Sequence, residues 1–257
     1  LHLISGGNID DGSTGAVAIS NLAIVSAGQV TLDNWQLGNS VNVIAANVTN
    51  PGAGFVFENS GGLIVGSVDG LTGITTNGGG ITVITHSPLT IASPIRELGG
   101  GNIRLTASSS LSNNDHIVLQ SLVIASGGNG SIQLTAGNNI VIEDQPTNEI
   151  SASGSGFISL SAGGDVQIEA GVELLAVPGN LQVNSSSTSI SGTEGPDPFE
   201  IVPTGTSTAQ TLAVYRNQLL VGEFAVADKL IVNGLGGDDI IEVTGNTNTS
   251  VWLFGGD

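Results

Sequence analysis

The chain has 257 residues, a formal net charge of −18 at pH 7 and no cysteine. Its four cations, Arg96, Arg104, Arg216 and Lys229, are scattered, so the sequence lacks the clustered basic face that binds nucleic acid or an anionic membrane. The lack of cysteine excludes disulfide scaffolds, thiolate zinc sites and cysteine nucleophiles. No apolar run reaches 18 residues, so we expect no membrane insertion. Abundant Gly, Ser, Thr, Asn, Val and Ile predict an almost wholly β chain.

A short sequence motif, predicted to form a strand, recurs along the first part of the chain. Residues 103–107, 132–136 and 158–162 alternate apolar and polar positions, and they begin 29 and 26 residues apart. Such spacing is typical of solenoids, in which one supersecondary unit stacks on the next. The predicted inward side chains are Ile103, Leu105, Ile132, Leu134, Ile158 and Leu160. The predicted outward side chains are Arg104, Gln133, Ser159 and Gln167.

Turns of similar composition precede these strands. Residues 7–9, 101–103, 138–140, 164–166 and 179–181 each join Gly, Asn or Asp to an apolar residue. Gly, Asn and Asp tolerate a left-handed backbone, so these phrases predict tight turns. A β-sandwich also has short strands at regular spacing. Repetition of whole phrases favours the solenoid over the sandwich.

The sequence pattern changes near residue 192, where glycine and proline interrupt the repeat. We therefore divide the chain into a β-solenoid over 1–192 and a small β module over 193–257. Within the module, Arg216-Asn217 is predicted to form a two-residue hairpin turn between two apolar strands. A short helix over 208–220 is the competing interpretation.

Residues 52–57, 62–70, 71–76 and 79–83 are Gly-punctuated phrases rich in Thr, Val and Ile, and Asn47-Val48-Thr49 precedes them. This succession resembles the repeat region of filamentous-haemagglutinin-type exoproteins, large bacterial surface or secreted adhesins often exported by two-partner secretion. The resemblance covers about residues 1–190. It implies a right-handed parallel β-helix and an extracellular or cell-surface location.

Residues 233–241, Asn-Gly-Leu-Gly-Gly-Asp-Asp-Ile-Ile, resemble the calcium-binding nonapeptide of haemolysin-type (repeats-in-toxin) proteins. Gly234, Gly236, Asp238 and Ile240 match the second, fourth, sixth and eighth positions, and Asn233 departs at the first. Residues 192–200 are a looser copy in which Asp197 stands at the sixth position. Gly255-Gly256-Asp257 resembles the start of another copy.

The resemblance implies that calcium is held by the turn residues Gly234, Gly236, Asp238, Asp239 and Asp257. Glycines let a turn expose its carbonyl groups, and aspartate adds charged oxygen. Because calcium takes six to eight oxygens, one nonapeptide supplies only part of a shell, and the next turn of the solenoid would complete it. The alternative is that these phrases form plain β-turns.

The alternative functional interpretation is a carbohydrate-active β-helix, such as a polysaccharide lyase or glycosidase. Glu143-Asp144 and Glu169 lie on neighbouring coils and could pair as two carboxylates. With 22 acidic residues, however, such pairs arise by chance. The three histidines, His2, His86 and His116, are far apart in the sequence and lack metal-ligand spacing. Trp35 and Trp252 could stack on sugars, although single aromatic residues on β surfaces usually pack.

The sequence thus predicts a non-enzymatic segment of a large bacterial exoprotein. We expect a β-helical stalk or adhesive rod whose partner is a protein or glycan on a host or neighbouring cell. We also expect the rest of a longer parent chain at both ends, because the sequence begins in a strand-like phrase and stops in a turn-like one. Unpaired strand edges at the two ends of the rod would favour end-to-end association.

Overall fold

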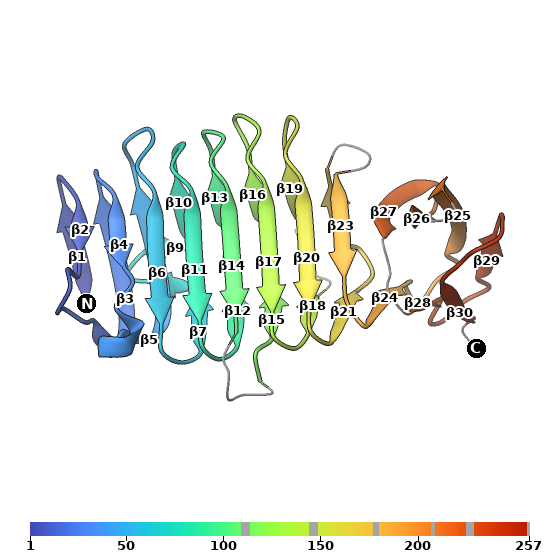
Figure 1. The fold of residues 1–257 in the computed structure, drawn as a ribbon, viewed down its shortest axis with the longest axis horizontal. Coiled ribbons are helices and arrows are strands. Elements are labelled where there is room, and N and C mark those ends of the chain that lie inside the picture. The colour runs from blue at the N-terminus through green and yellow to red at the C-terminus, as the bar shows by residue number, and fades with distance from the viewer. Residues whose placement is uncertain (109–113, 144–148, 177–179, 207–208, 225–228, 256–257) are drawn as a thin grey trace.

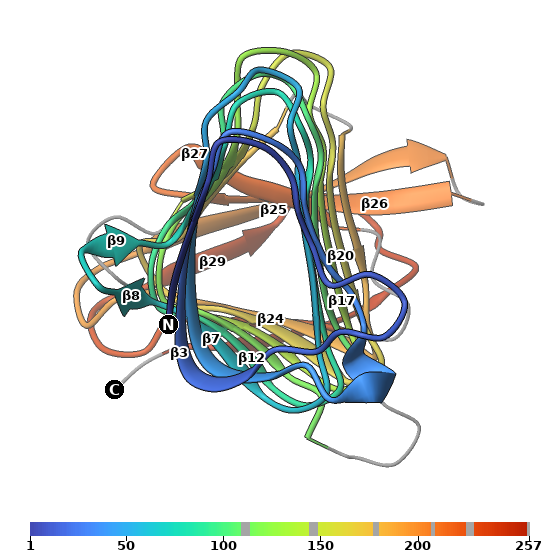
Figure 2. The same cartoon turned by 90° about the vertical axis from the view of Figure 1, so that its left-hand side faces the viewer.

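The protein is a right-handed parallel β-solenoid of about nine turns. The computed structural model describes residues 1–108, 114–143, 149–176, 180–206, 209–224 and 229–255. Strands stack along the long axis (Figure 1), and each coil is roughly triangular when viewed from the N-terminal end (Figure 2). In that view the chain runs clockwise as it recedes, which makes the solenoid right-handed. The predicted fold class is confirmed, and the β-sandwich is wrong because nearly all neighbouring strands are parallel.

One side of the triangle, the first face, is an eight-stranded parallel sheet. Its strands in order are β2 (Ile9–Asp10), β4 (Val30–Leu32), β6 (Phe55–Asn59), β11 (Ile81–Thr85), β14 (Ile103–Ala107), β17 (Ile132–Ala136), β20 (Ile158–Ala162) and β23 (Leu181–Asn184). The repeated phrases of the sequence are β14, β17 and β20. Their spacing is uneven because the turns between the faces differ in length.

The second and third faces share a 16-stranded sheet. The second face contains β7 (Leu63–Val65), β12 (Leu89–Ile91), β15 (Ile117–Leu119), β18 (Ile140–Ile142), β21 (Asp165–Ile168), β24 (Ser187–Ser191), β28 (Lys229–Asn233) and β30 (Ser250–Phe254). The third face contains β10 (Ile74–Thr76), β13 (Ile95–Glu97), β16 (Val123–Ala125), β19 (Glu149–Ala152) and β22 (Glu173–Leu175). The first coils are β1 (His2–Ser5), β3 (Ala18–Ser26) and β5 (Ser40–Val48). The two faces join because β5 pairs with both β7 and β10.

Two small elements flank the first coils. A 3-10 helix, η1 (Trp35–Leu37), lies at the corner before β5. A short hairpin, β8 (Ser67–Val68) with β9 (Leu71–Thr72), projects beside the third face in Figure 2. Val68 and Leu71 of this hairpin pack on Ala23 and Ala45. Both additions lie within residues 1–98, the part of the sequence that repeats less regularly than residues 99–183.

Inward side chains stack in columns through the solenoid. Ile103 pairs with Ile132, which pairs with Ile158, and all three are fully buried. Leu105, Leu134 and Leu160 form the next column in the same way. Burying an aliphatic side chain of this size contributes about 1.5–3 kcal/mol. The predicted outward positions Arg104, Gln133, Ser159 and Gln167 are all exposed or half-buried, as expected.

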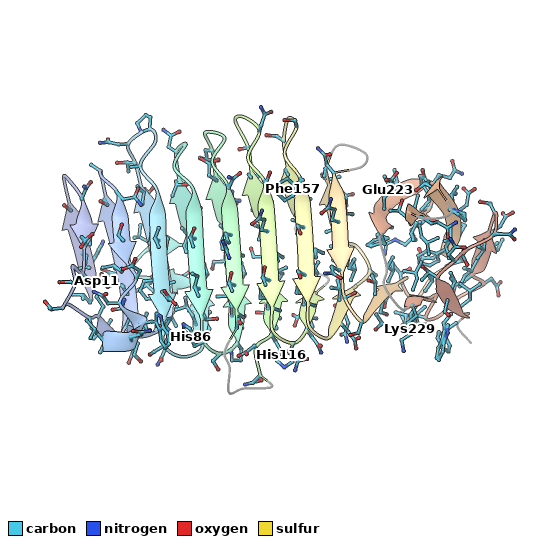
Figure 3. The ribbon with its side chains drawn as sticks, viewed as in Figure 1. Asp11, His86, His116, Phe157, Glu223 and Lys229 are labelled. Carbon is cyan, nitrogen blue, oxygen red and sulfur yellow. The ribbon has the colours of Figure 1, made fainter. Side chains whose placement is uncertain are left out.

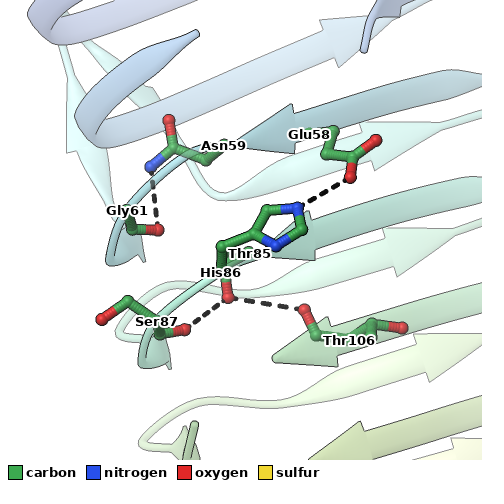
Figure 4. A network of polar contacts seen from close by, with 7 residues as sticks. All are labelled: Glu58, Asn59, Gly61, Thr85, His86, Ser87 and Thr106. Atoms are coloured by element: carbon green, nitrogen blue, oxygen red, sulfur yellow. Dashed lines mark hydrogen bonds and ion pairs between the residues drawn. The ribbon is translucent and has the colours of Figure 1, made fainter. Parts of the chain in front are cut away.

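Buried polar side chains occur where the chain turns a corner. Asn59, at the end of β6, is 1% exposed. Its amide donates to the carbonyl groups of Val41, Gly61 and Gly62 at 3.0–3.2 Å, and its Oδ1 accepts from the N–H of Val41 at 2.8 Å. Figure 4 shows this corner beside the next one, where Thr85 donates to the carbonyl of Ser87. Such bonds satisfy backbone groups that the bend removes from the ladder.

Glu97 is a buried carboxylate at the corner between the third and first faces. It is 0% exposed and accepts hydrogen bonds from the N–H groups of Gly78, Gly99 and Gly100 at 2.6–3.0 Å. In the following turns the equivalent positions are Ala125 and Ala152. The carboxylate therefore accepts from the glycine turn that directly follows it and from the glycine turn of the preceding coil.

The second-face ladder continues past residue 192. Ser187 pairs with Lys229, which pairs with Ser250, and one buried cluster extends from Leu22 to Val232. The antiparallel strands begin just after the predicted boundary: β25 (Pro198–Thr206), β26 (Ala209–Arg216) and β27 (Leu219–Phe224), with β29 (Ile240–Val243) parallel to β25. The part over 193–257 is thus two further turns carrying an inserted hairpin. Its independence as a domain stays a prediction.

The hairpin predicted near residue 216 is present, and the competing helix is wrong. β26 and β27 pair antiparallel, and the turn residues are Asn217 and Gln218, one position later than expected. Both have a left-handed backbone, with φ of 53° and 67°. Two successive positive φ values match the right-handed twist of the strands.

Candidate functional site

Two glycine–aspartate turns lie on top of each other near the C-terminal end. Ser191 pairs with Asn233, and Pro198 pairs with Ile240, so the turn after β24 lies directly below the turn after β28. Gly192 is therefore equivalent to Gly234, and Asp197 is equivalent to Asp239. The sequence alignment that matched Asp197 to Asp238 is wrong by one residue. The loop lengths between the paired strands decide this register, and the nonapeptide pattern does not fix it.

Asp197 closes its own turn. It is 2% exposed, and its Oδ2 accepts from the backbone N–H and the hydroxyl of Thr193, while Oδ1 accepts from the amide of Asn217 at 3.0 Å. Burial alone would raise the pKa of this carboxyl, but the bonds from Thr193 and Asn217 and the charge of Arg216 hold the pKa below its ordinary value. Both oxygens of the Asp197 carboxylate therefore already accept hydrogen bonds from protein groups.

Asp239 has a different environment. Its Oδ1 accepts from the N–H of Asp197 at 2.9 Å, and its Oδ2 is a buried oxygen with no hydrogen-bond partner among the described residues. A side chain at residue 234 would clash with this oxygen, so Gly234 is required by close approach. Gly236 packs against Glu194 in the turn below, whereas Asp238 is exposed.

The predicted calcium ligands are therefore only partly brought together. Gly234 and Asp239 are in contact, whereas Gly236 lies against Glu194 of the preceding turn and Asp238 is exposed. Asp257 lies outside the described residues. Within the described part of the chain, no three His, Asp or Glu side chains group in a geometry that could hold a metal ion.

The acidic residues considered for glycoside chemistry occupy equivalent corners. Glu143 and Glu169 directly follow Ile142 and Ile168, which pair across adjacent strands. Oε2 of Glu143 accepts a hydrogen bond of 3.0 Å from the amide of Gln120 in the preceding turn. Asp144 lies outside the described residues. The column thus stacks Gln120, Glu143 and Glu169 one above another.

The three histidines stay apart. Nδ1 of His2 lies 2.6 Å from Oδ2 of Asp69, and Nε2 of His86 lies 2.9 Å from Oε1 of Glu58 (Figure 4). His86 also stacks on Trp35, with ring centroids 3.7 Å apart. His116 lies on the turn that leads into β15 (Figure 3). His2 and His86 therefore each have a different carboxylate partner, and they do not share a site.

A further polar hollow, which sequence reasoning missed, lies on the second face. It has a volume of about 320 Å³ and is lined by Asp165, Ser186, Ser187, Lys229, Ser250 and Trp252. Lys229 lies along the lower side of the C-terminal turns in Figure 3. The inserted hairpin hid this site in the sequence, because it separates Ser187 from Lys229 by 42 positions although the two residues are paired.

Comparison of the chain with protein-family models, curated proteins and solved structures finds no match. In the part of the chain that the structure describes, none of the helical segments has the length and apolar character needed to cross a bilayer.

Proposed function

We propose that this chain is a β-helical stalk in a large exported surface protein of a bacterium. The observation that carries the proposal is the continuous stacking of inward columns along one axis, from the first coils to the last. About nine turns at a strand spacing of about 4.8 Å give a rod of roughly 43 Å. A rod whose turns each contact only their neighbours is lengthened by adding turns, which suits a spacer.

The outward positions of the first face support the same proposal. They are occupied mainly by hydrophilic side chains such as Thr82, Arg104, Gln133, Ser159 and Gln182. With a net charge of −18, the rod repels copies of itself at low ionic strength. The filamentous-haemagglutinin-like phrases of the sequence support the bacterial surface as the location.

Surface labelling tests the location. Antibodies against the purified chain are applied to intact and to permeabilised cells of the bacterium that encodes it. Labelling of intact cells is the expected result, and labelling confined to permeabilised cells would overturn the proposal.

Whole-turn deletion tests the role of a stalk. Ile132 and Ile158 occupy the same column, so removing residues 132–157 places Ile158 on Ile103 in register. We expect this variant to fold and to be displayed.

A second variant of the full-length chain replaces Arg104, Gln133 and Ser159 by alanine on the outer side of the first face. If the chain is only a stalk, this surface variant should fold and support cell attachment as the unsubstituted chain does. Loss of cell attachment in a folded surface variant would instead indicate that the first face itself is adhesive or catalytic.

A further inference from the structure

The hollow on the second face is built from one row of the strand ladder. Asp165, Ser187, Lys229 and Ser250 pair in succession, so their side chains point outward at the same level of β21, β24, β28 and β30. Adjacent strands are about 4.8 Å apart. Two residues further along β30, Trp252 points outward at the edge of the same hollow. The site thus depends on strands that are far apart in the sequence.

The row contains complementary hydrogen-bonding groups. The hydroxyl of Ser187 donates to Oδ1 of Asp165 at 2.6 Å, which fixes that carboxylate. Nζ of Lys229 lies 4.9 Å from the centroid of the Trp252 ring, which fixes the ammonium group by a cation–π contact. The hollow is therefore bordered by a carboxylate acceptor, an ammonium donor, the hydroxyls of Ser186 and Ser250 and, at its β30 edge, one indole ring.

The two tryptophans have different neighbours over their rings. Trp35 is stacked against His86, so one of its faces is already covered. Trp252 is 51% exposed, and the ammonium of Lys229 lies over its ring. Leu253 and Phe254 on the same strand are also exposed, at 42% and 49%. An exposed aromatic ring beside convergent polar groups is the usual composition of a small-ligand site.

We propose that this hollow binds a pyranose ring of an uncharged glycan. A pyranose has a face of C–H groups that stacks on an indole and a rim of hydroxyls that donate and accept hydrogen bonds. Asp165 would accept from one ligand hydroxyl and Lys229 would donate to another. The row carries one carboxylate and one ammonium, so it has no excess positive charge, and the net charge of −18 opposes an acidic glycan. The proposal goes beyond the stalk by giving it a recognition site.

A larger hollow, of about 630 Å³, lies between β23 and the inserted hairpin. Its lining includes the polar side chains of Gln182, Asn184, Thr211 and Glu223, and none of the described residues that line it is aromatic. Glu223 lies on the hairpin side of the rod, away from Lys229 (Figure 3). This second hollow therefore serves as the internal control.

The test begins with the purified chain on an array of neutral, uronic and sialylated oligosaccharides. The neutral glycan that binds best is then titrated while the tryptophan fluorescence is followed in Trp35→Phe, in which Trp252 is the remaining tryptophan. We expect Trp252 to respond. Trp252→Ala should weaken binding at least about tenfold, or about 1.4 kcal/mol, and Trp252→Phe should retain most of it. Lys229→Met, which keeps the packing stem, should also weaken binding.

Trp35→Phe and Glu223→Gln should bind as the unsubstituted chain does, and added salt should have little effect. Three results would overturn the proposal: no binding to any glycan of the array, binding confined to acidic glycans, or full binding by folded Trp252→Ala. None of these would affect the stalk proposal, which the surface labelling decides separately.

Discussion

The N–H of Asp197 donates a 2.9 Å hydrogen bond to Oδ1 of Asp239, the equivalent residue of the next turn. Two carboxyl residues that share a position in the repeat thus have different roles. Asp197 caps the turn to which it belongs, and Asp239 connects the two turns. This division follows from the inserted hairpin, because Asn217 at its tip supplies a donor to Asp197.

Asp197 is expected to stabilise the C-terminal turns in a pH-dependent way. Its pKa is lowered in the folded state, so its contribution is present above the ordinary value of 3.8 and is lost as the pH falls below that value. Asp197→Asn should therefore lower the free energy of unfolding at neutral pH, and the difference from the unsubstituted chain should shrink at pH about 3. Urea unfolding at both pH values measures this. Asp238→Asn, at an exposed carboxyl, is the control, and an equal loss in both variants would contradict the prediction.

Calcium is expected to act through Asp239 and not through the exposed Asp238. Oδ2 of Asp239 is buried without a partner among the described residues, and a hard cation would supply one. We expect added calcium to raise the Tm relative to chelator, Asp239→Asn to abolish the rise and Asp238→Asn to leave most of it. Magnesium serves as the ion control. If calcium leaves the Tm unchanged, the two stacked turns are plain structural turns.

Glu97 is expected to stabilise two glycine turns. Glu97→Ala leaves the N–H groups of Gly78 and Gly99 without their acceptor, at a cost of about 2–4 kcal/mol. Alanine is compatible with the backbone of this column, since Ala125 and Ala152 occupy it in later turns, so the loss reports the missing hydrogen bonds together with the space that the glutamate side chain leaves. Chemical denaturation measures it, with Thr75→Ala on the outer surface as control. A change below about 0.5 kcal/mol, typical of a surface site, would show that the turns do not depend on the carboxylate.

Gln218→Gly should stabilise the inserted hairpin. Gln218 has a φ of 67°, a backbone region that costs a non-glycine residue about 1–2 kcal/mol. Glycine removes part of this cost without removing a contact that the structure shows, so a rise of about 1 kcal/mol in unfolding free energy is expected. Thermal melting is the measurement. Asn217→Gly relieves similar backbone strain but deletes the bond to Asp197, so it should gain less. Equal gains would mean that this bond contributes little.

The sequence determined the class of the fold and the direction of its side chains. Phrases such as 132–136 specify both a strand and its inward face, because alternation and repeat length are local properties that stacking merely reuses. The hairpin near Asn217 was also predicted from local sequence, although its turn lies one residue later than predicted. The outward surface of the rod followed from the same pattern.

The tertiary structure alone decided which residues of different turns meet. Lys229 contacts the row of Asp165 and Ser187, and Asp197 is equivalent to Asp239, because the hairpin over 209–224 adds length without adding a turn. The inserted hairpin does not alter the apolar alternation of the strands that follow it, yet it changes which residues of successive turns pair with each other. For this reason the solenoid could be predicted from the sequence, whereas the hollow beside Trp252 and the stacked aspartate turns could be recognised only in the folded chain.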